Sequence, residues 1–286
     1  MRSVKLVSVI TCLILSCLSG SAQVIGLNSD TQGPENGYLL AIGGGQIPES
    51  IMDKFTELAG GLESPIVIIP TAAEDPNIVA IKKIWIDRGF KKITVLHTKN
   101  REVANSKKFT KPLREANAVW FGGGRQWRLV DSYKNTKTEK LLWKVLNRGG
   151  VIGGSSAGAT IQGSFLARGD TKNNQIMMGD HQEGFAFIKN IAIDQHSLAR
   201  NRHFDMFDIL KQKPELLGIS IDEGSAILVN KNIIEVLGNS YVIVYDGSFW
   251  SREGSELKSL PGKEKLFYFL REGDKYDFSQ RKIMEQ

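Results

Sequence analysis

The run Val-Ile-Gly-Gly-Ser-Ser-Ala-Gly-Ala at residues 151–159 carries the strongest structural signal in this chain. Its two β-branched residues predict the end of a strand, and its small residues predict the start of a helix. Residues 154–158 match the G-x-S-x-G pattern, in which the flanking glycines allow a sharp turn that lifts a serine hydroxyl off a sheet. Ser155 fits this pattern less well, because Ala157 stands where its second glycine is needed. The run therefore predicts a nucleophilic Ser156, and a glycine-rich turn with an N-capping serine is the structural alternative.

Short apolar segments alternate with helix-like segments before this run. β-branched and aromatic residues predict strands at Tyr38–Ile42, Pro65–Ile69, Lys92–Leu96, Ala116–Phe121 and Val151–Ile152. Apolar residues at helical spacing predict helices at Pro48–Leu58, Asn77–Asp87 and Thr138–Leu146. Repeated strand–helix–strand units favour parallel pairing through right-handed crossovers. The chain is therefore expected to form an α/β fold, with a mostly parallel sheet and helices on both faces.

The pattern changes to strands and turns after Gly218. Strands are expected at Ile219–Ile221, Ala226–Val229, Ile233–Val236, Tyr241–Val244 and finally around Phe267–Phe269. Short turn segments between them favour an antiparallel C-terminal extension at one edge of the sheet. Because no repeat, linker or change of composition interrupts the chain, residues 23–286 are expected to form a single domain.

Residues 1–22 read as a signal peptide. Arg2 and Lys5 precede the apolar run Leu6–Leu18, and small residues follow up to Ala22, where cleavage is expected. A membrane anchor is the alternative, but the 13 residues of the apolar run fall short of the roughly 20 that a spanning helix needs. The mature protein is therefore expected to be periplasmic or secreted, and a lipid anchor at Cys17 is a weaker alternative.

Removal of this segment changes what chemistry the chain can perform. Both cysteines, Cys12 and Cys17, lie within it, so the mature protein would have no disulfide, cysteine nucleophile or thiolate metal site. Loss of Arg2 and Lys5 lowers the formal net charge from +6 to +4. That charge, spread along the sequence, gives no basic stripe with interleaved aromatics, so no nucleic-acid partner is expected. No pair of histidines has metal-ligand spacing, and neither a metal nor a cofactor is expected.

Glycine clusters also follow two other predicted strands, at Gly43–Gly45 and Gly122–Gly124. Glycines at strand ends let the backbone approach a ligand closely and leave amide groups free to donate hydrogen bonds. Neither cluster is a Walker loop or a dinucleotide fingerprint. In open α/β sheets, ligands collect beyond the carboxyl ends of the strands, so a site is expected at this edge.

A serine nucleophile needs a base, and the base needs an orienting acid. The histidines available are His97, His181, His196 and His203. His196 is the best placed, because it follows the short apolar segment Ile191–Ile193. Asp222 and Glu223 stand at another strand end, and alternation along a strand would direct them to opposite faces. Only one of the two can meet the histidine, and the pattern alone leaves open which.

Four motifs in order make the chain similar to the S51 serine peptidases, the family of cyanophycinase and aspartyl dipeptidase. The matching segments are Phe121–Gln126, Gly153–Ala159, Asp194–His196 with Arg200 and Arg202, and Gly218–Glu223. The resemblance covers about Gly37 to Val244 and implies a fold like that of class I glutamine amidotransferases, a flavodoxin-like sheet. It also implies a homodimer.

The resemblance also assigns roles to residues of this chain. Ser156 would be the nucleophile, His196 the base and Glu223 the orienting acid. The amides of Gly124, Gly123 and Ala157 would form the oxyanion hole. The substrate cleft would be lined by Gln126, Asp194, Gln195, Arg200 and Arg202. For the two arginines, a solvated helix face is the alternative.

The chain departs from the family pattern at Asp205, where a third arginine is expected, and at Gly122 and Arg125. An acid in place of an arginine reverses the local charge, which argues against poly-aspartate recognition. The sequence therefore predicts an exported serine peptidase that cleaves a peptide or isopeptide bond, with a degenerate peptide-binding envelope protein as the alternative. An α/β-hydrolase esterase is a weaker alternative, because that fold places its histidine after the acid and no histidine follows His203.

Overall fold

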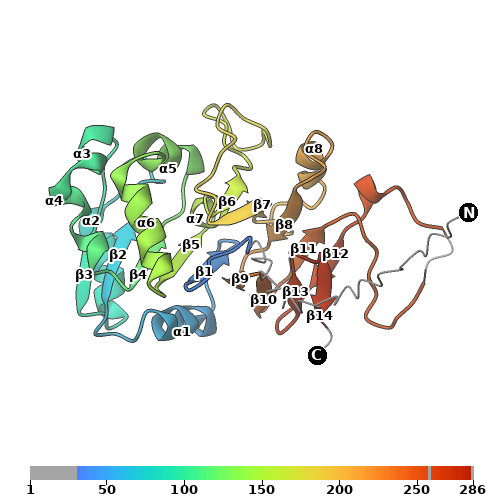
Figure 1. Ribbon diagram of the computed structural model, residues 1–286, viewed down its shortest axis with the longest axis horizontal. Coiled ribbons are helices and arrows are strands. Elements are labelled where there is room, and N and C mark those ends of the chain that lie inside the picture. The colour runs from blue at the N-terminus through green and yellow to red at the C-terminus, as the bar shows by residue number, and fades with distance from the viewer. Residues whose placement is uncertain (1–30, 257–258, 285–286) are drawn as a thin grey trace, which may run out of the picture. The chain divides into compact units, whose positions relative to one another are not determined.

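The computed structural model describes residues 31–256 and 259–284, and a nine-stranded sheet lies at its centre (Figure 1). Its strands are β1 (Tyr38–Ile42), β2 (Pro65–Ile69), β3 (Lys92–Val95), β4 (Ala118–Phe121), β5 (Val151–Ser155), β9 (Ser225–Asn230), β10 (Ile233–Gly238), β13 (Lys275–Asp277) and β14 (Lys282–Met284). They lie in the order β14-β13-β10-β9-β1-β5-β4-β2-β3. The run from β1 to β3 is parallel throughout, which confirms the predicted mostly parallel core.

A second sheet of five strands lies in the order β12-β11-β8-β7-β6. Its strands are β6 (Gly163–Phe165), β7 (Ile188–Gln195), β8 (Leu217–Ile221), β11 (Val242–Tyr245) and β12 (Tyr268–Leu270). Strands β6, β7 and β8 are parallel, whereas β11 pairs antiparallel with β8 and β12 antiparallel with β11.

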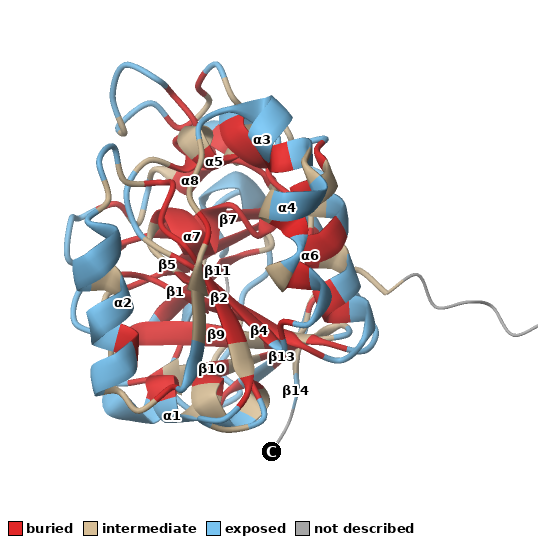
Figure 2. Ribbon diagram, turned by 90° about the vertical axis from the view of Figure 1, so that its left-hand side faces the viewer, coloured by how far each residue is buried: buried red, intermediate tan, exposed pale blue. Residues whose placement is uncertain are grey.

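Helices cover both faces of the central sheet, as predicted (Figure 2). They are α1 (Glu49–Leu58), α2 (Ile78–Asp87), α3 (Arg101–Asn105), α4 (Lys107–Thr110), α5 (Gln126–Tyr133), α6 (Lys137–Asn147), α7 (Ala157–Thr160) and α8 (Met206–Leu210), with 3-10 turns η1 (Pro112–Arg114) and η2 (Lys263–Lys265). Figure 2 shows α1 and α2 on one side of the strands and α3, α4 and α6 on the other. Strand β2 explains this arrangement: Ile66 and Ile68 pack on the α1 side, while Val67 and Ile69 pack on the α6 side. A strand covered on both faces reads as a continuous apolar run.

The antiparallel C-terminal strands are confirmed, but they do not all extend one edge of one sheet. Strands β9 and β10 add to β1 in the central sheet, whereas β8 and β11 belong to the second sheet. The chain crosses between the sheets in the turn after β8, where Gly224 takes φ +73°. Strand periodicity contains no information about which sheet a strand joins, because both sheets bury apolar faces.

The expected signal peptide, its cleavage site after Ala22 and Cys17 all lie outside the described residues. From Thr31 onward the chain clusters into one compact unit. None of the helices in the described part is long and apolar enough to cross a bilayer.

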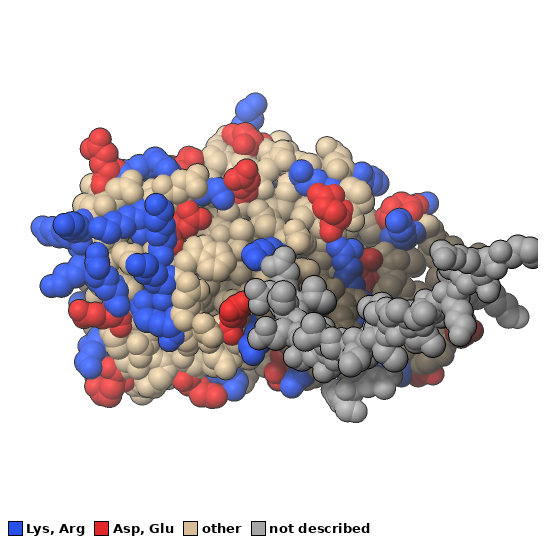
Figure 3. All heavy atoms as spheres, viewed as in Figure 1, with Lys and Arg blue, Asp and Glu red and all other residues tan. Residues whose placement is uncertain are grey.

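Positive charge is unevenly spread over the surface of the folded protein. Figure 3 shows lysine and arginine side chains gathered at the end of the molecule that carries α3 and α4. Lys107, Lys108, Lys111 and Arg114 are exposed there within eight residues of chain. Because these four residues are neighbours in the sequence, the charge at this end reflects a local run of basic residues that the overall composition averages out.

Candidate active site

Ser156 stands on the turn between β5 and α7, at the carboxyl edge of the central sheet. Its backbone takes φ 57° and ψ −114°, a strained conformation that non-glycine residues rarely adopt. Glycines on both sides make this turn fit: a Cβ on Gly154 would come within 2.3 Å of the Gly158 carbonyl oxygen, and one on Gly158 within 2.4 Å of the Phe121 carbonyl oxygen. The G-x-S-x-G pattern is thus a steric requirement of this turn.

His196 follows β7 and faces Ser156. Its Nε2 lies 2.9 Å from Ser156 Oγ, and its Nδ1 lies 2.5 Å from Glu223 Oε1. An ionised carboxylate only accepts hydrogen bonds, so Nδ1 carries the proton and Nε2 is left as an acceptor for the serine hydroxyl. This is the geometry in which a serine can lose its proton to a histidine.

The pKa of His196 lies below its ordinary value. Burial is the largest cause, and the positive charges of Arg200 and Arg202 lower the pKa further. The hydrogen bond and charge of Glu223 raise it and only partly offset these effects. The imidazole is therefore neutral at pH 7, the state in which it can accept a proton.

The two adjacent acids after β8 have different tasks. Glu223 meets His196, whereas Asp222 turns away and accepts hydrogen bonds from the amides of Leu198 and Ala199, both at 2.9 Å. The second Asp222 oxygen accepts from the Ser240 hydroxyl at 2.6 Å. Asp222 thus anchors the loop that follows His196, and the two acids point to different partners as expected, although both lie in the turn after β8 and not on the strand itself.

The glycine cluster after β1 packs against the His196–Glu223 pair, a contact that the sequence reasoning missed. A Cβ on Gly44 would come within 2.2 Å of His196 Cε1, and a Cβ on Gly45 within 2.4 Å of Glu223 Oε2. Both glycines have positive φ, +116° and +64°. The Gly43 carbonyl also accepts the His196 amide at 3.1 Å. The glycine cluster at the end of β1 predicted a close approach of the backbone to a ligand. In the structure, these glycines instead make room for the side chains of His196 and Glu223.

Two of the residues assigned to the oxyanion hole, Ala157 and Gly123, border Ser156. Ala157 begins α7, so its N–H has no acceptor within the helix. A Cβ on Gly123 would lie 3.6 Å from Ser156 Cβ, which places this glycine beside the serine. Gly124 takes φ +138°, and its nearest neighbours belong to Ala72.

The other three histidines are engaged elsewhere. His97 Nδ1 lies 2.9 Å from the Thr71 hydroxyl, and His181 Nε2 lies 2.8 Å from Asp131 Oδ1. The His203 ring packs against Phe204 with ring centroids 4.5 Å apart, and the backbone carbonyl of His203 accepts the Tyr245 hydroxyl at 2.6 Å. Among the described residues, His196 is the histidine that contacts Ser156.

Residues that the resemblance assigned to the substrate cleft are mostly buried and bonded to protein groups. Gln126 donates from Nε2 to the backbone carbonyls of Ala167 and Arg168, in the loop after β6, at 2.6 and 2.9 Å. Gln195 and Arg202 bond each other, with Arg202 Nη1 donating to Gln195 Oε1 at 3.3 Å. Arg200 is exposed, and the burial of the others makes it the accessible cation of the set.

Arg168 joins two of the charged residues and was not singled out from the sequence. It is fully buried at 1% exposure and holds Asp194 through two hydrogen bonds of 2.7 and 2.9 Å. It also donates to Asp205 Oδ2 at 2.6 Å. Burial alone would lower the pKa of the Arg168 guanidinium, but the two carboxylates outweigh it and raise that pKa. The acid at position 205 is therefore paired to an arginine from a different loop, so it does not simply reverse the local charge.

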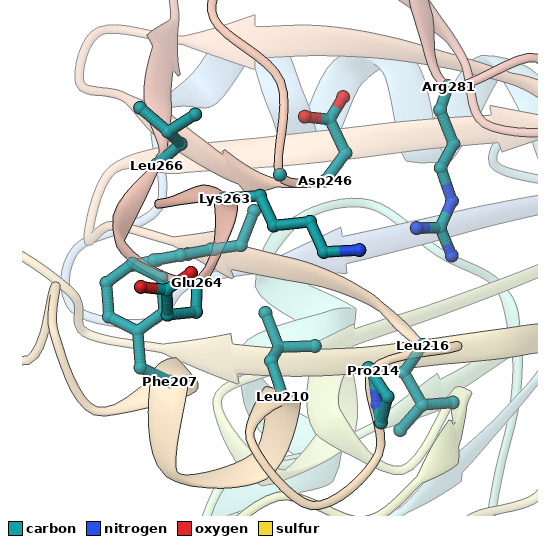
Figure 4. A pocket seen from close by; sticks show the side chains of 11 residues that line it. Phe207, Leu210, Pro214, Leu216, Asp246, Lys263, Glu264, Leu266 and Arg281 are labelled. Carbon is teal, nitrogen blue, oxygen red and sulfur yellow. The ribbon is translucent and has the colours of Figure 1, made fainter. Parts of the chain in front are cut away.

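A separate cavity of about 130 Å³ lies between α8 and η2 (Figure 4). Phe207, Leu210 and Leu266 line its apolar part, and Lys263 and Arg281 stand at its charged side. None of its lining residues belongs to the predicted site, so this cavity is distinct from the surroundings of Ser156.

The site therefore combines a serine on a strand-to-helix turn with a neighbouring histidine and glutamate, at the edge of a mostly parallel sheet of flavodoxin-like type. The model of Peptidase family S51 matches residues 39–237. This chain belongs to that family, as the resemblance predicted. Membership excludes the α/β-hydrolase esterase alternative.

Known relatives agree with this assignment. The cyanophycinase of Geminocystis herdmanii is 30% identical over 224 residues, which cover 74% of this chain and 82% of that protein. The cyanophycinase of Trichormus variabilis is 27% identical over 262 residues, 86% of this chain and 87% of that protein. The crystal structure of a peptidase from an acI-B1 Actinobacterium shares the fold, with a TM-score of 0.63 at 24% identity, and the match covers 86% of this chain and 99% of that one.

Proposed function

We propose that this chain is an exported serine-type peptidase that cleaves a peptide or isopeptide bond through an acyl-enzyme. The observation that carries the proposal is the continuous hydrogen-bonded chain from Ser156 through His196 to Glu223, at 2.9 and 2.5 Å. The neutral His196 supports it, because a base with a lowered pKa is free to accept a proton at pH 7.

In the first step, Ser156 Oγ attacks the substrate carbonyl carbon while His196 Nε2 takes the hydroxyl proton. Glu223 stabilises the resulting imidazolium, and the amides of Ala157, Gly123 and Gly124 hold the oxyanion. The C–N bond then breaks, and His196 returns the proton to the leaving amine. Water, deprotonated by the same histidine, releases the acyl group. General-base and oxyanion interactions typically contribute about 10²-fold or more each to such a reaction.

The substrate class follows from the charges near the site. We propose that exposed Arg200 binds a substrate carboxylate, such as that of a β-linked aspartyl residue, by a charge-assisted hydrogen bond. Gln126, Asp194, Gln195 and Arg202 would support the cleft from beneath, because their polar groups already bond protein partners or lie buried. The relatives named cyanophycinase favour an isopeptide substrate without establishing one for this chain.

Labelling by a fluorophosphonate probe tests the nucleophile. The wild type should be labelled, Ser156→Ala should not, and Ser155→Ala, one residue earlier on the same turn, should be labelled nearly as well. Circular dichroism should show all three folded. Equal labelling of the wild type and Ser156→Ala would refute the assignment. Peptide binding by an unlabelled wild type would favour the degenerate binding protein instead.

Export is tested separately. The basic and apolar pattern of residues 1–22 supports cleavage after Ala22. Amino-terminal sequencing of protein recovered from the periplasm or medium should begin at Gln23. A chain that keeps Met1 and stays in the cytoplasm would contradict this proposal, and a lipid on Cys17 would redirect it to an anchored form.

A further inference from the structure

An apolar groove lies between helices α1 and α2 and the carboxyl ends of β2 and β4. Its volume is about 390 Å³, and Ile68, Ile81, Ile84, Trp85, Trp120 and Gly122 are among its lining residues. This volume falls in the range of about 300–1,000 Å³ that is usual for small-ligand sites. None of these residues has a role in the mechanism proposed above.

The groove ends one residue along the chain from the glycine that borders Ser156. Gly122 lines it, and the next residue, Gly123, lies beside the serine with a Cβ position 3.6 Å from Ser156 Cβ. The strand order β1-β5-β4-β2 places the groove on the β4 side of Ser156, whereas Gly44 and His196 meet on the β1 side. A substrate bound at Ser156 can therefore reach the groove without displacing the His196–Glu223 pair.

The chemistry of the lining favours an apolar, uncharged occupant. The lining cation, Arg88, is already paired with Glu49 through two hydrogen bonds of 2.7 and 2.8 Å. No carboxylate is among the lining residues. Ile84 leaves 64% of its surface exposed on α2, which is apolar surface that a bound side chain could cover.

The floor of the groove is rigid and large enough for a ring or a branched chain. Trp85 and Trp120 are 5% and 7% exposed and pack edge to face with ring centroids 5.2 Å apart. Phe55 supports both rings from beneath, at 5.7 and 5.0 Å. An apolar cavity of about 150 Å³ is enough to bind benzene.

We infer that this groove binds an apolar side chain, of leucine or phenylalanine size, carried by a substrate residue next to the scissile bond. The inference rests on the proposed function, because it needs a peptide held at Ser156. It adds an apolar determinant to the carboxylate recognition assigned to Arg200. The peptidase would then select substrates at two points on opposite sides of the chemistry.

The test compares two glutamate variants on one helix. Ile84 lines the groove, whereas Ile86, 52% exposed on the same helix, does not. Peptide and isopeptide libraries, with alanine, leucine or phenylalanine on either side of the bond, are assayed for kcat/KM. The wild type should prefer leucine or phenylalanine over alanine by at least about tenfold at one position. Ile84→Glu should abolish this preference, and Ile86→Glu should retain it.

Fluorophosphonate labelling of Ser156 separates the two proposals. If the wild type is labelled but does not prefer leucine or phenylalanine over alanine, the groove assignment is overturned and the peptidase proposal stands. The same conclusion follows if the wild type has this preference and both variants retain it. If the wild type is neither labelled nor active, both fail. Size-exclusion chromatography is run in parallel to follow the oligomeric state. A change of oligomeric state in Ile84→Glu without a change of substrate preference would show that a second copy of the chain covers the groove. That result would also overturn the assignment.

Discussion

Replacing Gly44 by alanine would place a methyl group against the imidazole of His196. The new Cβ would lie 2.2 Å from His196 Cε1, which is about 1.3 Å closer than the roughly 3.5 Å of a normal carbon–carbon contact. Backbone hydrogen bonds hold this segment, since the Gly43 amide donates to the Ser225 carbonyl at 3.0 Å and the Gly44 carbonyl accepts from the Gly224 amide at 3.3 Å, so we expect the ring to move. A displacement of about 1 Å in a catalytic group typically costs about 10²-fold in rate. We therefore expect Gly44→Ala to reduce the second-order rate of fluorophosphonate labelling about 100-fold.

Gly61→Ala is the matched control for backbone strain. Gly61 takes φ +89°, comparable to the +116° of Gly44, but a Cβ there would meet no atom within 4 Å. Both variants should lose about 1–3 kcal/mol in the free energy of unfolding because alanine is strained at such φ values. In a domain of this size that loss lowers Tm by several degrees, which calorimetry can measure. Only Gly44→Ala should lose labelling.

Labelling of Gly44→Ala within threefold of the wild type, with the protein folded, would refute this reasoning. It would mean that His196 tolerates a shift of more than 1 Å or that Ser156 does not depend on it. Equal loss in Gly61→Ala would assign the effect to stability instead of to the position of the ring.

Two further predictions concern charge. Arg200→Gln removes a cation that lowers the pKa of His196, and the pKa of His196 should therefore rise. Because only the neutral imidazole accepts a proton, the acid limb of the pH dependence of the labelling rate should move to higher pH. This shift should shrink in 1 M salt, and an unchanged limb at low salt would contradict the coupling. Arg168→Met leaves Asp194, which is 0% exposed, without its cation and should destabilise the fold by about 3–5 kcal/mol. Lys83→Met breaks an exposed ion pair and should cost less than about 1 kcal/mol, so similar losses of unfolding free energy in the two variants would argue against the buried pair.

Steric requirements that act within a few residues could be predicted from the sequence. The turn at Ser156 needs glycine at 154 and 158 because each packs against a backbone carbonyl, and this requirement leaves the pattern G-x-S-x-G. The two-sided burial of β2 leaves a continuous run of apolar residues, and the β-branched residues in that run predicted a strand. The S51 family assignment rested on such short motifs in order, and the family model bears it out.

Boundaries were less accurate where glycine interrupts a strand. Strand β5 runs on to Ser155 because Gly153 and Gly154 pair with β1 and β4, although glycine is a weak strand former. Pairing partners on both sides supply the hydrogen bonds that intrinsic propensity does not predict. The sequence also did not predict that the C-terminal strands are divided between two sheets, because an apolar strand face can pack in either sheet.

The sequence by itself determined the alternation of strands and helices, the turn at Ser156 and the family. These depend on allowed backbone angles and on periodicity, which act within a few residues. Only the tertiary structure showed that Gly44 packs on the imidazole and that Arg168 pairs with Asp194 and Asp205. The residue pattern also left open whether Asp222 or Glu223 meets His196, and the structure joins Glu223 to it, the acid that the family resemblance had assigned. These contacts join residues 26 to 152 positions apart, and their geometry follows from which strands lie side by side.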